Sequence, residues 1–130
     1  MITYEFHRYA DLYPLASEDE LARLTEDIRK NGLANPIVLY QDHILDGRNR
    51  YIACRHAGVE PRYQKWEDVC HPNFAESAGN ENAALHWVVS QNSHRRHLST
   101  SQLAMVAAKI AKVYQENAKQ RSLGNLKRGD

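Results

Sequence analysis

The segment with the clearest chemistry spans residues 44–53, Ile-Leu-Asp-Gly-Arg-Asn-Arg-Tyr-Ile-Ala. An apolar run meets Asp-Gly, and two arginines then open an apolar-periodic stretch, which predicts a strand, a tight turn and a helix start. Glycine lets the backbone approach a ligand, and a helix N-terminus offers unpaired N–H groups and a positive dipole end. Arg48 and Arg50 add forked donors that suit phosphate. The segment predicts a phosphate site, and a plain turn with solvated arginines is the alternative.

A second polar segment covers residues 91–99, Gln-Asn-Ser-His-Arg-Arg-His-Leu-Ser. Six of these nine residues are Gln, Asn, His or Arg, whose side chains can contact phosphate, a base or metal-bound water. Core packing does not need this composition, although a polar loop between helices would also account for it. Two such segments in one small domain favour a shared pocket for a polyanion or a nucleotide.

Length and composition limit the class of protein. The chain has 130 residues, of which 42% are hydrophobic and 25% charged, as is ordinary for one small globular domain. No apolar run approaches the ~20 residues of a membrane span, and the first residues show no signal-peptide pattern. The cysteines, Cys54 and Cys70, form no CxxC pair. We therefore expect a cytoplasmic protein with neither a disulfide framework nor a zinc site.

The net charge is +1, but the charged residues are distributed unevenly along the chain. Residues 1–93 hold 9 Lys and Arg against 14 Asp and Glu, whereas residues 94–130 hold 8 against 2. A basic tract of this kind can contact nucleic-acid phosphates without reading a base sequence. The expected contacts are Arg96, Lys127 and Arg128. A solvated helix face is the alternative interpretation for the lysines between them.

Hydrophobic periodicity predicts an α/β protein of the α+β kind, with a small mixed sheet, packed helices and a C-terminal helical segment. Strands are expected at 2–9, 36–40, 44–45 and 62–66. Helices are expected from about 18 to 31 and at 49–57, 82–90 and 99–117. Capping-box patterns at Ser17 and Ser99 mark two helix starts. The last ten residues lack periodicity, which predicts a linker.

Three boxes of residues, taken together, resemble a known family. Residues 24–39 form an amphipathic helix, a glycine and a proline-led strand. Residues 47–53 read Gly-Arg-Asn-Arg-Tyr-Ile-Ala, and residues 91–95 read Gln-Asn-Ser-His-Arg. These boxes are similar to those of the N-terminal domain of the ParB partition-protein family, including its Gly-Glu-Arg-Arg-x-x-Ala and Glu-Asn-x-x-Arg boxes. The resemblance implies a ParB/sulfiredoxin-like fold for residues 1–98, which a free-serine kinase also shares.

The resemblance implies a nucleotide site, with CTP as the nucleoside triphosphate and Mg²⁺ as its ion. The residues that it places at the nucleotide are Gly47, Arg48, Asn49, Arg50, Arg95, Asn35 and Pro36. The residues that it places near the metal are Asn92, Gln91 and Asp46.

Residues 91, 46 and 49 bear on the chemistry that the resemblance implies. Gln91 stands where the family has Glu, so a negative charge near the metal is missing. Because magnesium prefers hard oxygen ligands such as carboxylates, the missing charge predicts slow or absent hydrolysis of the nucleotide. Weak nucleoside triphosphatase activity stays an alternative. Asp46 resembles the Asp-Gly-x-x-Arg version of the kinase-like branch. Position 49 is Asn, so the catalytic cysteine of sulfiredoxin has no counterpart.

The expected function is therefore that of a CTP-type nucleotide-binding module in a DNA-associated partition or regulatory protein. Two alternatives stay open: a small-molecule kinase or other phosphoryl-transfer enzyme, and a DNA-binding regulator with a vestigial nucleotide site. The expected partners are a nucleotide and the DNA backbone, with a homodimer left open and no membrane. Residues 99–120 are expected to begin a DNA-binding helical domain, and residues 121–130 to form a basic linker or tail.

Overall fold

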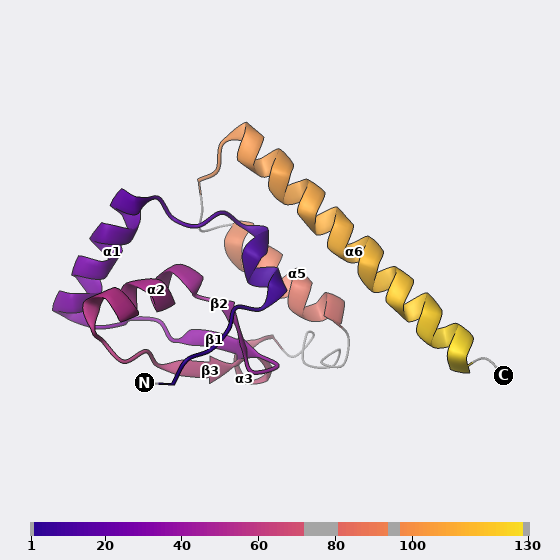
Figure 1. The fold of residues 1–130 in the computed structure, drawn as a ribbon, viewed down its shortest axis with the longest axis horizontal. Coiled ribbons are helices and arrows are strands. Elements are labelled where there is room, and N and C mark those ends of the chain that lie inside the picture. The colour runs from indigo at the N-terminus through magenta and orange to yellow at the C-terminus, as the bar shows by residue number, and fades with distance from the viewer. Residues whose placement is uncertain (1, 72–80, 94–96, 129–130) are drawn as a thin grey trace.

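The computed structural model describes residues 2–71, 81–93 and 97–128 and has a mixed α+β fold (Figure 1). Its sheet has the strand order β2-β1-β3. Strand β1 (Ile37–Tyr40) pairs antiparallel with β2 (His43–Asp46) and parallel with β3 (Tyr63–Lys65). The predicted small mixed sheet with packed helices is confirmed.

A two-residue turn joins β1 to β2. Gln41 and Asp42 both have positive φ, at 52° and 60°. This is the type I′ geometry whose twist matches that of the flanking strands. Because successive side chains on a strand point to opposite faces, β1 supplies two cores: Ile37 and Leu39 enter one cluster, and Val38 and Tyr40 enter the other.

Helices α1 (Glu18–Asn31) and α2 (Arg48–Ala57) pack together beside one face of the sheet (Figure 1). The Ser17 hydroxyl accepts a hydrogen bond from the Glu20 N–H at 3.2 Å, so the predicted N-cap of α1 is confirmed. Ile28 of α1 is buried against Ala53 and Cys54 of α2. The contact explains why Cys54 lies in the core.

The larger core lies on the other side of the sheet. It is built from a short 3₁₀ helix, η1 (Arg8–Leu12), and the helices α3 (Trp66–Val69), α5 (Glu81–Ser93) and α6 (Thr100–Arg128). Tyr9, Trp66, Leu85 and Val88 are almost completely buried there. The predicted helix over 82–90 is confirmed, with Val88 buried in this core and Val89 partly buried against it.

Helix α6 is a long rod that lies across the larger core and extends past it (Figure 1). Ser99 and Gln102 form a reciprocal capping box, with hydrogen bonds of 2.9 and 3.1 Å, as predicted. Halfway along, Asn117 is 4% exposed. It donates to the Tyr9 hydroxyl at 3.0 Å and to Asn82 Oδ1 at 2.9 Å, and its own oxygen accepts from Arg8 at 2.8 Å. This network fixes α6 against η1 and α5.

Two expectations about the chain ends are wrong. Residues 2–9 do not form a strand, because only Phe6 bridges Ile44 and η1 begins at Arg8. The alternation of Ile2, Tyr4 and Phe6 instead sends the last two side chains onto the small core beside α2. The expected end of the last helix near residue 117 is also wrong, because α6 continues through Arg128.

No helix in the described part of the chain combines the length and the apolar character needed to cross a membrane.

His7 fixes the start of η1. Its Nδ1 accepts a hydrogen bond from the Tyr9 N–H at 3.1 Å, and its ring packs 4.5 Å from the Tyr9 ring and 5.4 Å from the Tyr40 ring, centroid to centroid. Burial, helped by the charges of Arg8 and His43, lowers the pKa of His7 from 6.5 to about 4. The cap needs an unprotonated Nδ1, so η1 depends on neutral His7.

We expect acid to destabilise the fold through His7. Because its pKa is lower in the folded chain, the unfolded chain binds more protons between pH 6.5 and about 4. The free energy of unfolding is therefore unaffected by this group above pH 6.5. It falls as the pH drops below that value, by on the order of 2–3 kcal/mol near pH 4. Chemical denaturation of the wild type and His7→Asn from pH 7 to pH 4 would measure this, since Asn keeps a capping acceptor without titrating. Parallel pH profiles for the two proteins would contradict the assignment.

Candidate functional site

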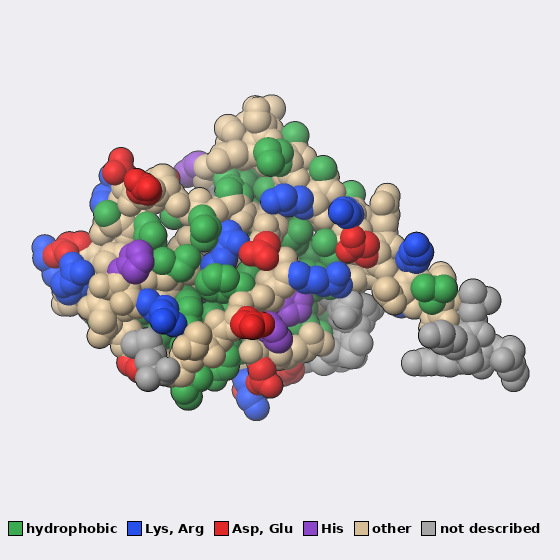
Figure 2. Space-filling view, in the orientation of Figure 1, with side chains coloured by type: hydrophobic (Ala, Val, Ile, Leu, Met, Phe, Trp, Pro, Cys, Tyr) green, Lys and Arg blue, Asp and Glu red, His purple; other side chains and the backbone are tan. Residues whose placement is uncertain are grey.

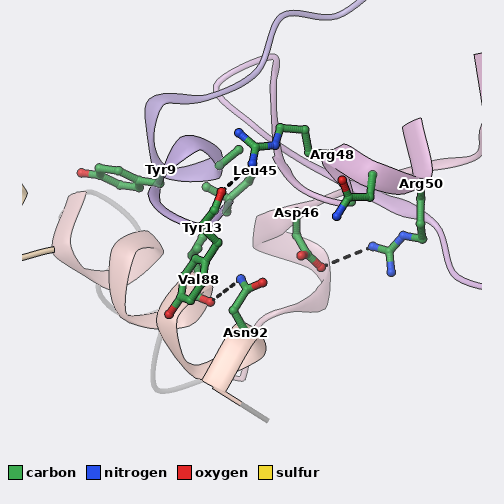
Figure 3. Close-up of a pocket in the computed structure, with 11 residues that line it drawn as sticks. Tyr9, Tyr13, Leu45, Asp46, Arg48, Arg50, Val88 and Asn92 are labelled. Carbon is green, nitrogen blue, oxygen red and sulfur yellow. Dashed lines mark hydrogen bonds and ion pairs between the residues drawn. The ribbon is translucent and has the colours of Figure 1, made fainter. Parts of the chain in front are cut away.

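A pocket of about 180 Å³ lies where the β2–α2 turn, η1 and α5 meet (Figure 3). It is lined by Tyr9, Ala10, Tyr13, Leu45, Asp46, Gly47, Arg48, Asn49, Arg50, Val88 and Asn92. The two polar segments singled out in the sequence therefore meet at one place, through residues 46–50 and Asn92.

Gly47 forms the turn between β2 and α2. It has a left-handed backbone, with φ 102° and ψ 25°, which L side chains rarely adopt. A Cβ at this position would lie 2.9 Å from Arg50 Nη2 and 3.2 Å from Ile37 Cγ1. The Arg50 guanidinium therefore rests against the bare glycine. After Gly47, the backbone N–H groups of Arg48, Asn49 and Arg50 lie in the first turn of α2. N–H groups in a first helical turn have no carbonyl partner within the helix.

Arg50 is held between the strand end and the loop before β1. Its Nη2 donates to Asp46 Oδ2 at 3.3 Å and to the Pro36 carbonyl at 3.4 Å. Asp46 is 8% exposed, so this carboxylate is fixed by the end of β2. The Nε of Arg50 is buried and has no hydrogen-bond partner among the described residues. A buried donor without a hydrogen-bond partner is unfavourable, so this contact costs the fold some stability.

Arg48 points the other way, toward η1 (Figure 3). Its Nη1 pairs with Asp11 Oδ1 at 2.7 Å, and its Nη2 donates to the Tyr13 carbonyl. The Arg48 side chain is 13% exposed, whereas that of Asp11 is 66% exposed. Arg48 is therefore oriented by buried backbone on one side and by a carboxylate at the surface on the other.

Two asparagines complete the polar lining. Asn49 Oδ1 accepts from the Ala16 N–H at 3.1 Å, so this side chain ties down the loop before α1. Asn92 Nδ2 donates to the Val88 carbonyl at 2.8 Å, which orients the amide. Its oxygen is then turned toward Asp46 (Figure 3). Together Asp46 and Asn92 offer oxygen atoms to the pocket beside the first turn of α2.

Other predicted site residues lie elsewhere or outside the described part of the chain. Asn35 is exposed and does not line the pocket, and Pro36 reaches the site only through its carbonyl contact with Arg50. Gln91 is half-buried on α5, and it is not part of the lining either. The predicted residues Arg95 and Arg96 are outside the described residues, as are the side chains of Lys127 and Arg128.

Sequence reasoning missed the contribution of η1. Tyr9, Ala10 and Tyr13 line the pocket, and Asp11 pairs with Arg48 at its edge. None of these residues belongs to the three boxes. A lone Asp near the start of a chain carries no signal that it will meet an arginine 37 positions later.

The described residues hold no group of three or more His, Cys, Asp or Glu side chains arranged for a metal. Cys54 is buried, and burial raises the pKa of its thiol, as it does for Cys70.

Comparison of the chain with protein-family models, with curated proteins and with solved structures finds no match. The likeness to the ParB family therefore depends on the three sequence boxes.

Gly47 and Gly58 offer a matched test of the turn. Both have positive φ, but no described atom lies within 4 Å of a Cβ added at Gly58. We expect Gly58→Ala to cost about 1–2 kcal/mol of unfolding free energy, which is the strain of the left-handed backbone. Gly47→Ala should cost about 1–3 kcal/mol more, because the new methyl also displaces Arg50. Equal costs in urea denaturation would show that Arg50 does not rest against Gly47.

Proposed function

We propose that the chain is a nucleotide-binding module of the ParB type, with a CTP-type ligand whose phosphates sit on the first turn of α2. The observation that carries the proposal is the meeting of residues 46–50 with Asn92 in one pocket. Residues 47–50 and Asn92 come from two of the boxes that carry the family likeness, and the two groups are 42 or more positions apart in the chain. A fold that unites them supports a common ligand.

The polar atoms of the pocket suit phosphate oxygens. The first-turn N–H groups of α2 point at the ligand with the positive end of the helix dipole behind them. Arg50 adds a guanidinium in the lining of the pocket. The pocket volume of about 180 Å³ is below the ~300–1,000 Å³ of sites that enclose a drug-sized molecule. It therefore suits phosphate groups, with the sugar and base lying toward the opening.

Mg²⁺ suits the oxygen donors that Asp46 and Asn92 offer beside the first turn of α2. The ion prefers oxygen ligands, keeps several waters, and is commonly held by one or two carboxylates together with substrate phosphates. Asp46 and Asn92 would hold it, and the ion would screen charge between the phosphate groups. Asp46 already shares its charge with Arg50, so this chain supplies little negative charge to the ion. Gln91 adds none, which supports slow or absent hydrolysis.

A panel of nucleotides tests the proposal. We expect the full chain to bind a nucleoside triphosphate, with CTP preferred over ATP and ADP, and more tightly with Mg²⁺ than without it. Arg50→Lys should weaken binding by about tenfold or more, because Lys keeps the charge opposite Asp46 but lacks the fork. Calorimetric titration would measure both effects.

Arg55→Lys is the matched control, since Arg55 lies on the same helix near its other end and contacts the Tyr51 hydroxyl at 3.0 Å. It should leave nucleotide affinity unchanged. Equal affinity in Arg50→Lys and the wild type, with both folded, would remove Arg50 from the site. No binding of any nucleotide would reject the proposal.

A second candidate is a small-molecule phosphoryl-transfer enzyme on the same pocket, which the position of Asp46 favours. Phosphoryl transfer needs a positioned metal and a group that orients the acceptor, and a carboxylate beside the phosphate site could serve in either role. Formation of ADP from ATP only when a small hydroxyl compound is present would distinguish this candidate from a nucleotide-binding module.

DNA is the proposed macromolecular partner, through phosphate contacts of α6. Lys109, Lys112 and Lys119 are exposed on this helix, and Figure 2 shows basic side chains along it. We expect binding at low salt without sequence preference, at roughly 10⁻⁴–10⁻⁶ M, and its loss by a few hundred millimolar salt.

Charge removal at the end of α6, in Lys127→Ala with Arg128→Ala, should weaken DNA binding more than the removal of two charges in Lys109→Ala with Lys112→Ala does. The reason is that α6 carries residues 127 and 128 beyond the larger core, where a duplex can approach (Figure 1). Mobility-shift titrations on unrelated duplexes would measure both variants. Binding to one duplex alone, persisting at high salt, would contradict a purely electrostatic contact.

A further inference from the structure

The pocket already holds an anion of the chain's own. Asp11 Oδ1 lies 2.7 Å from Arg48 Nη1, at the edge of the pocket that Arg48 lines. With the Arg50–Asp46 pair at 3.3 Å, the site contains two arginines and two carboxylates, so their formal charges cancel. A phosphate group that binds the Arg48 guanidinium through Nη1 must therefore replace the Asp11 carboxylate.

Asp11 can give way without disturbing the fold. Its side chain is 66% exposed, so it can turn into solvent. Its neighbours Tyr9 and Leu12 are buried at 0% and 4% exposure and hold η1 in place. Arg48 keeps its hydrogen bond to the Tyr13 carbonyl when Asp11 leaves, so the guanidinium stays oriented. Asp46 differs, because it is 8% exposed and lies at the end of a paired strand.

The two arginines diverge. Residues i and i+2 of a helix do not face each other, and in Figure 3 Arg48 points toward Tyr13 while Arg50 points toward Asp46. A single phosphate group on the first turn of α2 is therefore poorly placed to contact both guanidinium groups. Two linked phosphate groups extend further and carry more negative charge, so they can reach both.

We propose that Asp11 is a specificity-determining residue, a built-in competitor that restricts the site to ligands with two or more linked phosphate groups. This inference rests on the proposed function and adds how the site selects its ligand. An isolated phosphate does not replace the Asp11–Arg48 pair, whereas a diphosphate or triphosphate displaces Asp11 and gains both arginines.

The experiment titrates inorganic orthophosphate and pyrophosphate into the full chain, in the wild type, Asp11→Asn and Glu60→Gln. Glu60 is exposed just past the other end of α2, so Glu60→Gln controls for the change in net charge. We expect the wild type to prefer pyrophosphate by about tenfold or more, the size of one additional charge-assisted contact. Asp11→Asn should tighten pyrophosphate binding by about two- to fivefold, the size of an exposed ion pair, and Glu60→Gln should not.

A second readout needs no variant. The Arg48 Nε–H resonance should shift when pyrophosphate is added to the wild type, because the partner of the guanidinium changes from carboxylate to phosphate. Equal affinities in Asp11→Asn and Glu60→Gln, or an unmoved Arg48 resonance in the pyrophosphate complex, would overturn the inference and leave the proposed function standing. Equal affinity for the two phosphates in the wild type would overturn it too. No binding of either phosphate or of any nucleotide would reject the proposed function, and the inference with it.

Discussion

The absence of a side chain at Gly47 is the constraint on which the pocket depends. The left-handed turn directs α2 back over the sheet, and the Arg50 guanidinium occupies the space that a Cβ would need. That placement puts Arg50 within reach of Asp46 and the Pro36 carbonyl, which joins the helix, the strand end and the loop before β1. One glycine therefore sets both the direction of the helix and the position of the charge at its start.

Local signals made much of the fold predictable. The capping patterns at Ser17 and Ser99 depend on residues three apart, and both appear in the structure as predicted. The Asp-Gly pair before Arg48 likewise predicts the turn that the structure shows there. The meeting of residues 46–50 with Asn92 was expected only from the order of the boxes, because no local rule brings together segments that are so far apart in the chain.

The parts that sequence did not predict depend on distant partners. Residues 2–9 alternate as a strand would, but His7 caps a 3₁₀ helix instead, and its ring finds its place between Tyr9 and Tyr40 only in the folded chain. The Asp11–Arg48 pair likewise joins residues 37 positions apart. The end of α6 was missed for another reason. Lys, Arg, Gln and Leu are good helix formers, so an exposed helix can continue without an apolar stripe.

Asn117 gives α6 a single register against the rest of the molecule. An apolar stripe alone tolerates slippage by one helical turn, because one aliphatic side chain can replace another. A slip of four residues would bring Val113 or Arg121 beneath Tyr9 and Asn82. Val113 would leave their polar groups unmatched, and Arg121 would bury a charge. A buried polar residue in a helix interface is known to fix register in this manner. The direction and phase in which the outer half of α6 leaves the core are thus set by one amide.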